Sequence, residues 1–175
     1  MEKSDARANE MAREIEEMNH RRREVDEATT AQALIQLEQS PEDDFCNIVH
    51  GTDWHRGVVG IVASRMIEYR YRPSIVLSEE EGILIGSARS VDGVDIHKAL
   101  ESCEDLLLQF GGHTMAAGLS LDARHLKSFK ERLNQAIKDQ LNGVAPKPII
   151  RCDREVHISE LSLEALKELD QLEPF

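Results

Sequence analysis

Apolar residues recur at helical spacing in four stretches of the chain. In the first, about residues 5–39, they form only a narrow stripe on a highly charged sequence, so we expect a long helix that connects domains rather than a core helix. Residues 57–71, 95–108 and 123–141 carry wider apolar faces, which predict helices that pack on a core. The narrow stripe consists of Met11, Ile15, Met18, Val25 and Ala28.

Short apolar runs alternate with these helical stretches. Residues 45–50, 74–77, 83–90 and 115–121 predict strands, and the polar residues 79–82 predict a hairpin turn between the second and the third strand. Strands that alternate with helices and then form a hairpin predict an α/β fold, in which a mixed β-sheet is flanked by helices.

Changes in composition along the 175 residues predict three parts. Residues 1–44 would be a connector helix and a turn, and residues 45–143 one compact domain. Residues 144–175 would be a linker and the beginning of a further domain, with a strand at residues 149–153 and a helix at residues 161–172.

The net charge of −12 lies mainly on the flanks of the chain. Residues 1–44 contain 6 Lys and Arg against 13 Asp and Glu, and residues 151–175 contain 3 against 7, whereas residues 45–150 contain 12 against 13. A local phosphate site is therefore compatible with the middle part, but without a broad basic face we expect weak affinity for any nucleic acid strand. No apolar run approaches membrane-spanning length, so we expect no membrane association, and three widely separated cysteines predict reduced thiols in a cytoplasm.

Two short motifs in the middle part contain residue types that bind phosphate. The first, residues 86–90, follows an apolar run, so Arg89 is expected at the end of a strand with Ser87 on the same face. Ser90 would join them if the strand ends at Arg89 and the chain turns back. A guanidinium binds two phosphate oxygens at once and stays charged at any working pH. The alternative is that Arg89 bridges an acidic residue on a neighbouring helix.

The second motif, residues 110–118, places two glycines before a histidine and small residues after it. Gly111 and Gly112 are expected to present backbone amides to a ligand, and the simpler interpretation is a tight Gly-Gly turn beside a salt-bridged arginine. Gly118 would allow the close approach of a ligand to the backbone, and His113 would contact a phosphate whether its imidazole is charged or neutral. The simpler alternative is a turn histidine that is bonded to the backbone.

Three further residues are candidates, each with a second interpretation. Arg22 shares the stripe of the long helix and faces a DNA groove, or the arginines around it pair with glutamates at four-residue spacing. His55 precedes a helix whose free N–H groups attract an anion, or its segment is explained by packing alone. Trp54 stacks on a base or, more simply, belongs to the core.

Taken together, these segments resemble the RecJ family of the DHH phosphoesterase superfamily. The resemblance rests on residues 54–65, 86–90 and 110–118 and on an Asn-x-x-Arg pattern at Asn19 and Arg22. It covers nearly the whole chain and implies the DHH-associated, substrate-binding domain of a single-strand-specific 5′→3′ exonuclease acting in DNA repair and recombination. The Gly-Gly-His element by itself is shared with other DHH-family phosphodiesterases.

The resemblance also implies what this chain lacks. Such enzymes hold two divalent metals, Mn²⁺ or Mg²⁺, in a catalytic domain, whereas this sequence contains no Asp-His-His or Asp-His-Asp, and its 7 histidines are scattered. We therefore expect a piece of a longer enzyme, monomeric and inactive alone, without a metal or cofactor of its own. Its partners would be single-stranded DNA with a 5′ end and the missing catalytic domain. His113 would reach toward that domain as the catalytic group, while Arg89 and Gly112 hold the 5′-terminal phosphate.

Two alternatives stay open. The chain could be part of a DHH-family oligoribonuclease or cyclic-dinucleotide phosphodiesterase, although the helix with Asn19 and Arg22 and the extension after residue 149 speak against this. It could also be a protein-interaction module whose acidic helix docks a partner.

Overall fold

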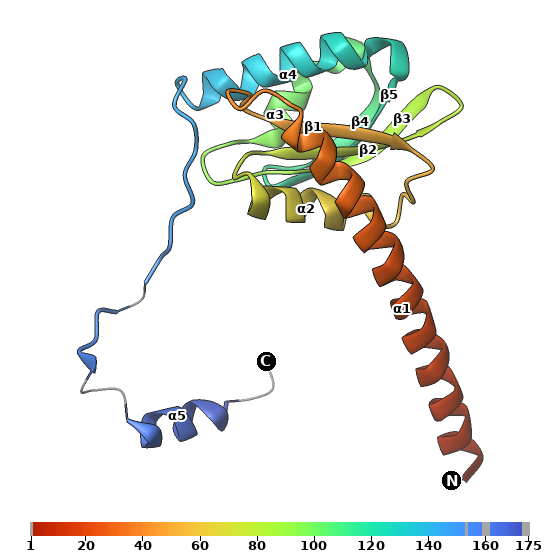
Figure 1. Ribbon diagram of the computed structural model, residues 1–175, viewed down its shortest axis with the longest axis vertical. Coiled ribbons are helices and arrows are strands. Elements are labelled where there is room, and N and C mark those ends of the chain that lie inside the picture. The colour runs from red at the N-terminus through yellow and green to blue at the C-terminus, as the bar shows by residue number, and fades with distance from the viewer. Residues whose placement is uncertain (1, 153, 159–161, 173–175) are drawn as a thin grey trace.

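The computed structural model describes residues 2–152, 154–158 and 162–172. A five-stranded sheet with the strand order β1-β2-β3-β5-β4 forms its centre (Figure 1). β1 pairs with β2 in parallel, and the other neighbours are antiparallel. This confirms the predicted α/β fold with a mixed sheet and flanking helices. The strands are β1 (Asn47–Thr52), β2 (Ser74–Glu80), β3 (Ile83–Arg89), β4 (Leu107–His113) and β5 (Ala116–Asp122).

Helices cover both faces of the sheet. In Figure 1, α3 and α4 lie above the sheet and α2 lies below it, while the first half of α1 projects away from the domain. After α4 the chain continues as an extended segment that leads to α5. The helices are α1 (Glu2–Glu38), α2 (Val59–Tyr69), α3 (Ile96–Glu101), α4 (Leu126–Gln140) and α5 (Leu163–Asp170), with 3-10 turns η1 (Glu104–Leu106) and η2 (Ala123–His125).

Two apolar clusters hold these layers together. On the upper face, Phe129, Leu133 and Ile137 recur every four residues along α4 and are fully buried against the sheet. On the lower face, α2 and the end of α1 bury a second cluster that contains Val62 and Met66. Removing a large side chain from such a core costs about 2–5 kcal/mol, so these contacts set the arrangement of the elements.

The last part of α1 is attached to α2 and β1. Leu37 is fully buried in the lower cluster. Arg65 of α2 donates to the buried carboxylate of Asp26 at 2.7 Å, and the same carboxylate accepts from Thr30 at 3.3 Å. The stripe of the first half, by contrast, is exposed, with Met18 at 62%. α1 is therefore a docked helix at one end and a projecting one at the other, whereas the sequence predicted a connector throughout.

A side chain of α1 also protects the open edge of β1. The Gln36 amide donates to the His50 carbonyl at 2.7 Å, and its oxygen accepts from the His50 N–H at 3.2 Å. The amide thereby takes the place of a neighbouring strand at a sheet edge that would otherwise expose unpaired backbone groups. Arg70 donates to the Leu37 carbonyl at 3.0 Å, which closes the C-terminal end of the same helix.

The predicted helix at residues 95–108 is wrong beyond its first turns. α3 ends at Glu101, η1 follows, and Leu107 begins β4. The apolar positions from Ile96 to Leu107 have helical spacing, but Leu107 pairs with Leu121 of β5 and extends the sheet. Pairing along a sheet is not visible in local periodicity, so the pattern alone favoured the helix.

Four smaller differences concern the ends of elements and one strand that is not formed. β1 begins at Asn47 rather than residue 45, because the Phe45 N–H is bonded to the Asn134 side chain at 2.6 Å instead of to a strand. β2 extends through Glu80 into the predicted turn. Residues 149–152 form no strand, and residue 153 lies outside the described residues. The last helix begins at Leu163, and the predicted start at residue 161 also lies outside them.

The Asp26–Arg65 pair provides a test of how α1 is docked. Arg65→Met should lower the free energy of unfolding by about 1–3 kcal/mol, because it leaves a buried carboxylate without its charged donor. The control is Arg21→Met, which removes an exposed α1 pair with Glu17 at 4.0 Å and should change stability by about 0.5 kcal/mol or less. Urea unfolding of both variants measures this, and equal losses would contradict the docking role of Asp26.

The His50 side chain provides a test against pH. Burial, with a smaller effect of Lys130, lowers the pKa of His50 below its ordinary value of 6.5. The unfolded chain therefore binds this proton more readily, so stability should be complete above about pH 6.5 and fall as the pH decreases through it. Urea unfolding at about pH 7.5 and 5.5 should show a smaller loss for His50→Gln than for the wild type. An unchanged loss would assign the pH dependence to other groups.

Candidate phosphate-binding site

Residues of β3, β5 and β4 form three cross-strand rows on the α2 side of the sheet. Directly paired residues of antiparallel strands lie on the same face, so the register fixes the members of each row. α2 packs over β2 and β3. The glycines of the second row, on β5 and β4, are exposed. The rows are Arg89, Ala116 and His113; Ser87, Gly118 and Gly111; and Ile85, Ser120 and Gln109.

Arg89 lies at the end of β3 and its guanidinium folds back along the strand. It donates to the Ser87 hydroxyl at 2.6 Å and to the Ala88 carbonyl at 2.9 Å. Ser87 and Arg89 thus share a face, as the alternation of side chains along a strand predicts. Within the described residues no carboxylate forms an ion pair with Arg89, so the alternative of a salt-bridged arginine is wrong.

The guanidinium lies on the first turn of α2, at Gly60. A Cβ at Gly60 would come within 2.7 Å of the Arg89 Nη2 and 3.3 Å of the Ser87 Oγ. This turn has no side-chain cap at Val58 and no acidic residue. The positive end of a helix dipole, a guanidinium and a hydroxyl therefore meet without a compensating carboxylate, and this arrangement favours an anion.

Sequence reasoning missed Gly60. Glycine in a helix costs about 1 kcal/mol relative to alanine, so its place in the first turn of an otherwise apolar helix was the available signal. The sequence did not show which side chain would occupy the space beside Gly60, because this depends on how α2 packs on β3.

The Gly-Gly-His element lies in a strand and not in a turn. Gly111 and Gly112 belong to β4, and the hairpin turn follows at Thr114 and Met115, so the alternative of a tight turn at the glycines is wrong. Gly112 has a φ of +151°, and a Cβ there would come within 2.3 Å of the Ala116 carbonyl. Gly112 therefore permits the hairpin, whereas Gly111 belongs to the row on the α2 side of the sheet.

His113 ends β4 and is exposed in the row of Arg89. The two residues are separated by β5, which places their backbones roughly 10 Å apart at ordinary strand spacing. By register, Arg89, Ser87 and His113 therefore lie on one face of the sheet, with His113 on the far side of a strip of small residues, and their joint use for a phosphate stays a prediction.

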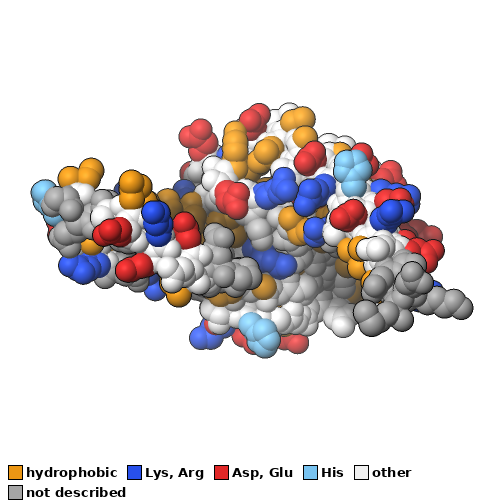
Figure 2. All heavy atoms as spheres, turned by 90° about the horizontal axis from the view of Figure 1, so that it is seen from below, with side chains coloured by type: hydrophobic (Ala, Val, Ile, Leu, Met, Phe, Trp, Pro, Cys, Tyr) orange, Lys and Arg blue, Asp and Glu red, His pale blue; other side chains and the backbone are white. Residues whose placement is uncertain are grey.

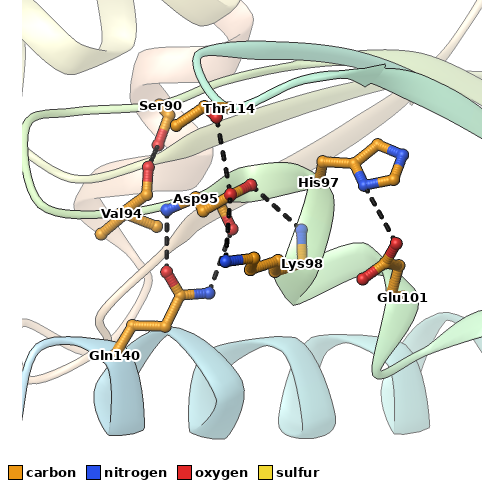
Figure 3. Close-up of polar contacts among 8 residues, drawn as sticks. All are labelled: Ser90, Val94, Asp95, His97, Lys98, Glu101, Thr114 and Gln140. Atoms are coloured by element: carbon orange, nitrogen blue, oxygen red, sulfur yellow. Dashed lines mark hydrogen bonds and ion pairs between the residues drawn. The ribbon is translucent and has the colours of Figure 1, made fainter.

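The hairpin that carries His113 is held from the other face of the sheet (Figure 3). The Ile96 N–H donates to the Thr114 carbonyl at 3.0 Å, and the Thr114 hydroxyl donates to the Asp95 carboxylate at 3.5 Å. Gln140 of α4 fixes Asp95 in turn, since it accepts from the Asp95 N–H at 2.7 Å and donates to the Asp95 carbonyl at 3.0 Å. The position of His113 thus depends on α3 and α4.

Ser90 does not belong to the exposed surface. β3 ends at Arg89, as one prediction required, but the Ser90 side chain is 7% exposed. Its hydroxyl donates to the Val94 carbonyl at 2.8 Å (Figure 3). It closes the loop before α3, so the hydroxyl partner of Arg89 is Ser87.

His55 and Arg22 are not brought to the three rows. His55 is exposed beside a separate hollow of about 400 Å³, which Arg56 and Glu80 also line, and its Nδ1 accepts from the Gly57 N–H at 3.0 Å. Arg22 is an exposed residue near the middle of α1. Glu17 pairs with Arg21, but within the described residues Arg22 forms no ion pair.

Trp54 is a core residue. It is 5% exposed, packs in the cluster under α2, and donates from Nε1 to the Gln32 side chain at 2.7 Å. The core interpretation is therefore confirmed, and a stacking role is excluded by burial.

A further hollow lies elsewhere. It measures about 540 Å³, lies between the end of α1 and α4, and includes no residue of the three rows. Burial lowers the pKa of Lys130 and raises the pKa of Asp44, and the opposite charges of the two groups partly offset this. The Asn134 side chain in the same hollow accepts a hydrogen bond from the Phe45 N–H. We therefore interpret this hollow as a polar junction between helices.

The charge on the α2 side is mixed. Figure 2, seen from below and so from this side, shows basic and acidic side chains interspersed over the surface. In the described part of the chain, no helix is both long and apolar enough to cross a membrane. The same residues contain no group of three or more His, Cys, Asp and Glu that could hold a metal ion.

Comparison with known proteins identifies the fold and its relatives. The sequence matches the DHHA1 domain family over residues 43–139. The single-stranded-DNA-specific exonuclease RecJ of Bacillus subtilis is 36% identical over 177 positions, which cover 100% of this chain and 22% of that protein. RecJ of Escherichia coli is 32% identical, and the match covers 94% of this chain and 30% of that protein.

Solved structures give the same relationship. The crystal structure of RecJ from Thermus thermophilus in complex with Mg²⁺ has a TM-score of 0.77 at 31% identity and covers 93% of this chain and 25% of that one. The corresponding Mn²⁺ complex has a TM-score of 0.76. The chain thus spans about a quarter of the length of these relatives. The resemblance indicated by the motifs is confirmed: the chain belongs to the DHHA1 domain family and is similar to the DHHA1-containing region of RecJ exonucleases.

Proposed function

We propose that this chain binds the 5′-terminal phosphate of single-stranded DNA for a RecJ-like 5′→3′ exonuclease that acts in DNA repair and recombination. The observation that carries the proposal is the meeting of Arg89, Ser87 and the uncapped first turn of α2 at Gly60, without a carboxylate. Support for the nucleic acid comes from the relatives, which are described as single-stranded-DNA-specific exonucleases. Because those relatives are bacterial, we place the activity in the cytoplasm, with the DNA.

Each group has a distinct part in this binding. The Arg89 guanidinium would donate to two phosphate oxygens in place of the Ala88 carbonyl, and the Ser87 hydroxyl would donate to a third. The N-terminal end of α2 adds the positive end of its dipole. His113, on the far side of β5, would donate to the scissile phosphate and stabilise the charge that develops on its oxygens.

The described part of this chain does not offer a site for the metal ions of the reaction. The solved relatives are described as complexes with Mg²⁺ and Mn²⁺, and another is described as bound to manganese. The described residues offer no cluster of ligands for such ions. We therefore assign the ions to a catalytic domain of the longer protein, and this chain, acting as a monomer, to the recognition of the substrate.

Nothing in the comparisons favours the two alternatives, a DHH-family oligoribonuclease or cyclic-dinucleotide phosphodiesterase and an acidic protein-interaction module. Binding by this chain alone should be weak, since few phosphates are neutralised and the surrounding charge is mixed.

The phosphate site is tested by an NMR titration of the labelled chain with a 5′-phosphorylated dinucleotide. We expect shifts at residues 87–89, at Gly60 and at residues 111–118. Arg89→Ala should weaken binding by about 10- to 100-fold, the usual effect of removing a charged hydrogen-bond donor, and His113→Ala should weaken it less. Arg132→Ala, an exposed arginine of α4, is the matched control and should bind as the wild type does. Equal binding by the Arg89 and Arg132 variants would refute the site.

Gly60→Ala tests the role of α2 in placing the guanidinium. The added methyl group meets the end of a flexible side chain, so the fold should be kept, and helix propensity should add about 1 kcal/mol of stability. The displaced Arg89 should nevertheless weaken phosphate binding several-fold. Ser64→Ala, at an exposed position of the same helix, serves as the control. Calorimetric titration with the same dinucleotide measures this, and unchanged affinity in Gly60→Ala would show that the position of Arg89 does not matter.

A further inference from the structure

The tip of the β4–β5 hairpin carries His113 but has no buried side chain of its own, since residues 112–115 are all exposed. Two backbone hydrogen bonds join the tip to the rest of the described chain. The Ser90 N–H donates to the Met115 carbonyl at 2.9 Å, and the Ile96 N–H donates to the Thr114 carbonyl at 3.0 Å. A segment with few buried contacts is held mainly by such bonds, so the place of the imidazole depends on where these two amides lie.

Both amides belong to the segment that directly follows Arg89. Ser90 is the next residue in the chain, and Ile96 begins α3. Between them, the Ser90 hydroxyl is buried and closes the loop by its bond to the Val94 carbonyl at 2.8 Å (Figure 3). Residues 90–95 are thus joined to Arg89 covalently and to the tip of His113 by hydrogen bonds. We call this segment the spacer.

The far end of the spacer is attached to α4. The Gln140 amide accepts from the Asp95 N–H at 2.7 Å and donates to the Asp95 carbonyl at 3.0 Å, so one side chain binds both backbone groups of a residue (Figure 3). The neighbouring Ile96 N–H, which holds the hairpin, is fixed with them. Because α4 is buried along one face in the apolar cluster above the sheet, the spacer is tied to the core.

Neither bracing side chain is placed to contact a phosphate itself. The Ser90 hydroxyl is buried and directed at Val94, and Gln140 belongs to α4, above the sheet. Arg89 and Ser87, by contrast, lie on the α2 side. Any effect of Ser90 and Gln140 on a ligand must therefore act through the groups that the spacer holds.

We propose that Ser90 and Gln140 are positioning residues, which brace the spacer and thereby set the separation between Arg89 and His113. This inference rests on the proposed function, in which Arg89 binds the terminal phosphate and His113 the scissile one. The spacer then matches the distance between two successive phosphates of a strand. A binding group keeps such a geometry only when its supporting residues are themselves fixed. Ser90, the last residue of the first motif, thus gains a role without touching the substrate.

Two probes test this by NMR titration of the full chain: inorganic phosphate, which occupies the Arg89 site alone, and a 5′-phosphorylated dinucleotide, which carries both phosphates. Ser90→Ala and Gln140→Met should each weaken dinucleotide binding by about 3- to 10-fold and change phosphate binding by less than about twofold. Added to His113→Ala, neither should weaken binding further, because the effect acts through the imidazole. The matched control is Ser40→Ala, which removes a hydroxyl bond to the Leu37 carbonyl at 2.7 Å and should bind both probes normally.

Hydrogen exchange supplies a second readout. The Ser90 and Ile96 amides should exchange faster in Gln140→Met than in the wild type, while amides of the β3–β5 pairing stay protected. If Ser90→Ala does not fold, Gln140→Met decides the question, since Gln140 is only partly buried.

The outcomes separate this inference from the proposed function. Equal weakening of both probes, or losses that add to that of His113→Ala, would overturn the positioning role and leave the phosphate site in place. A wild type that binds the dinucleotide no more tightly than phosphate would do the same, because His113 would then contribute nothing to be positioned. If neither probe binds the wild type, the phosphate site and this inference both fall.

Discussion

The alternation of side chains along β3 is the constraint on which the domain and its site depend together. Leu84 and Ala88 face the upper core and are fully buried, while Ser87 and Arg89 face α2. Because the period of a strand is two, a shift of one residue would bury the arginine and expose the core residues. The antiparallel pairing of β3 with β2 and β5 fixes this register. The register of β3 thus determines both the packing of the core and the orientation of the guanidinium.

α2 adds a second requirement, that of close approach. Its first turn lies against the Arg89 side chain, and only a residue without a Cβ permits the observed contact at Gly60. The guanidinium is therefore held by a hydroxyl, a carbonyl and a helix end, none of which carries a negative charge. A structural arginine would normally be paired with a carboxylate when it is partly buried. Its absence here among the described residues supports the proposed binding of an anion by Arg89.

Local patterns in the sequence were sufficient for much of this. The apolar period of α4, the hairpin between β2 and β3, and the common face of Ser87 and Arg89 all follow from residues close together in the chain. What failed depends on distant contacts. Leu107 has helical spacing but pairs with β5, and Ser90 turns inward to Val94. The burial of Trp54 depends on α1 and α2, so its core role was only one of two interpretations from sequence.

The separation of stability from recognition explains how the domain tolerates its costly features. An uncompensated guanidinium beside a helix end and two glycines in paired strands each reduce stability, by amounts of about 1 kcal/mol. The two apolar clusters and the polar attachment of α1 lie away from the α2-side surface of β5 and β4, so they supply stability without occupying it. A surface left open in this way is available to the phosphate that we propose as its ligand.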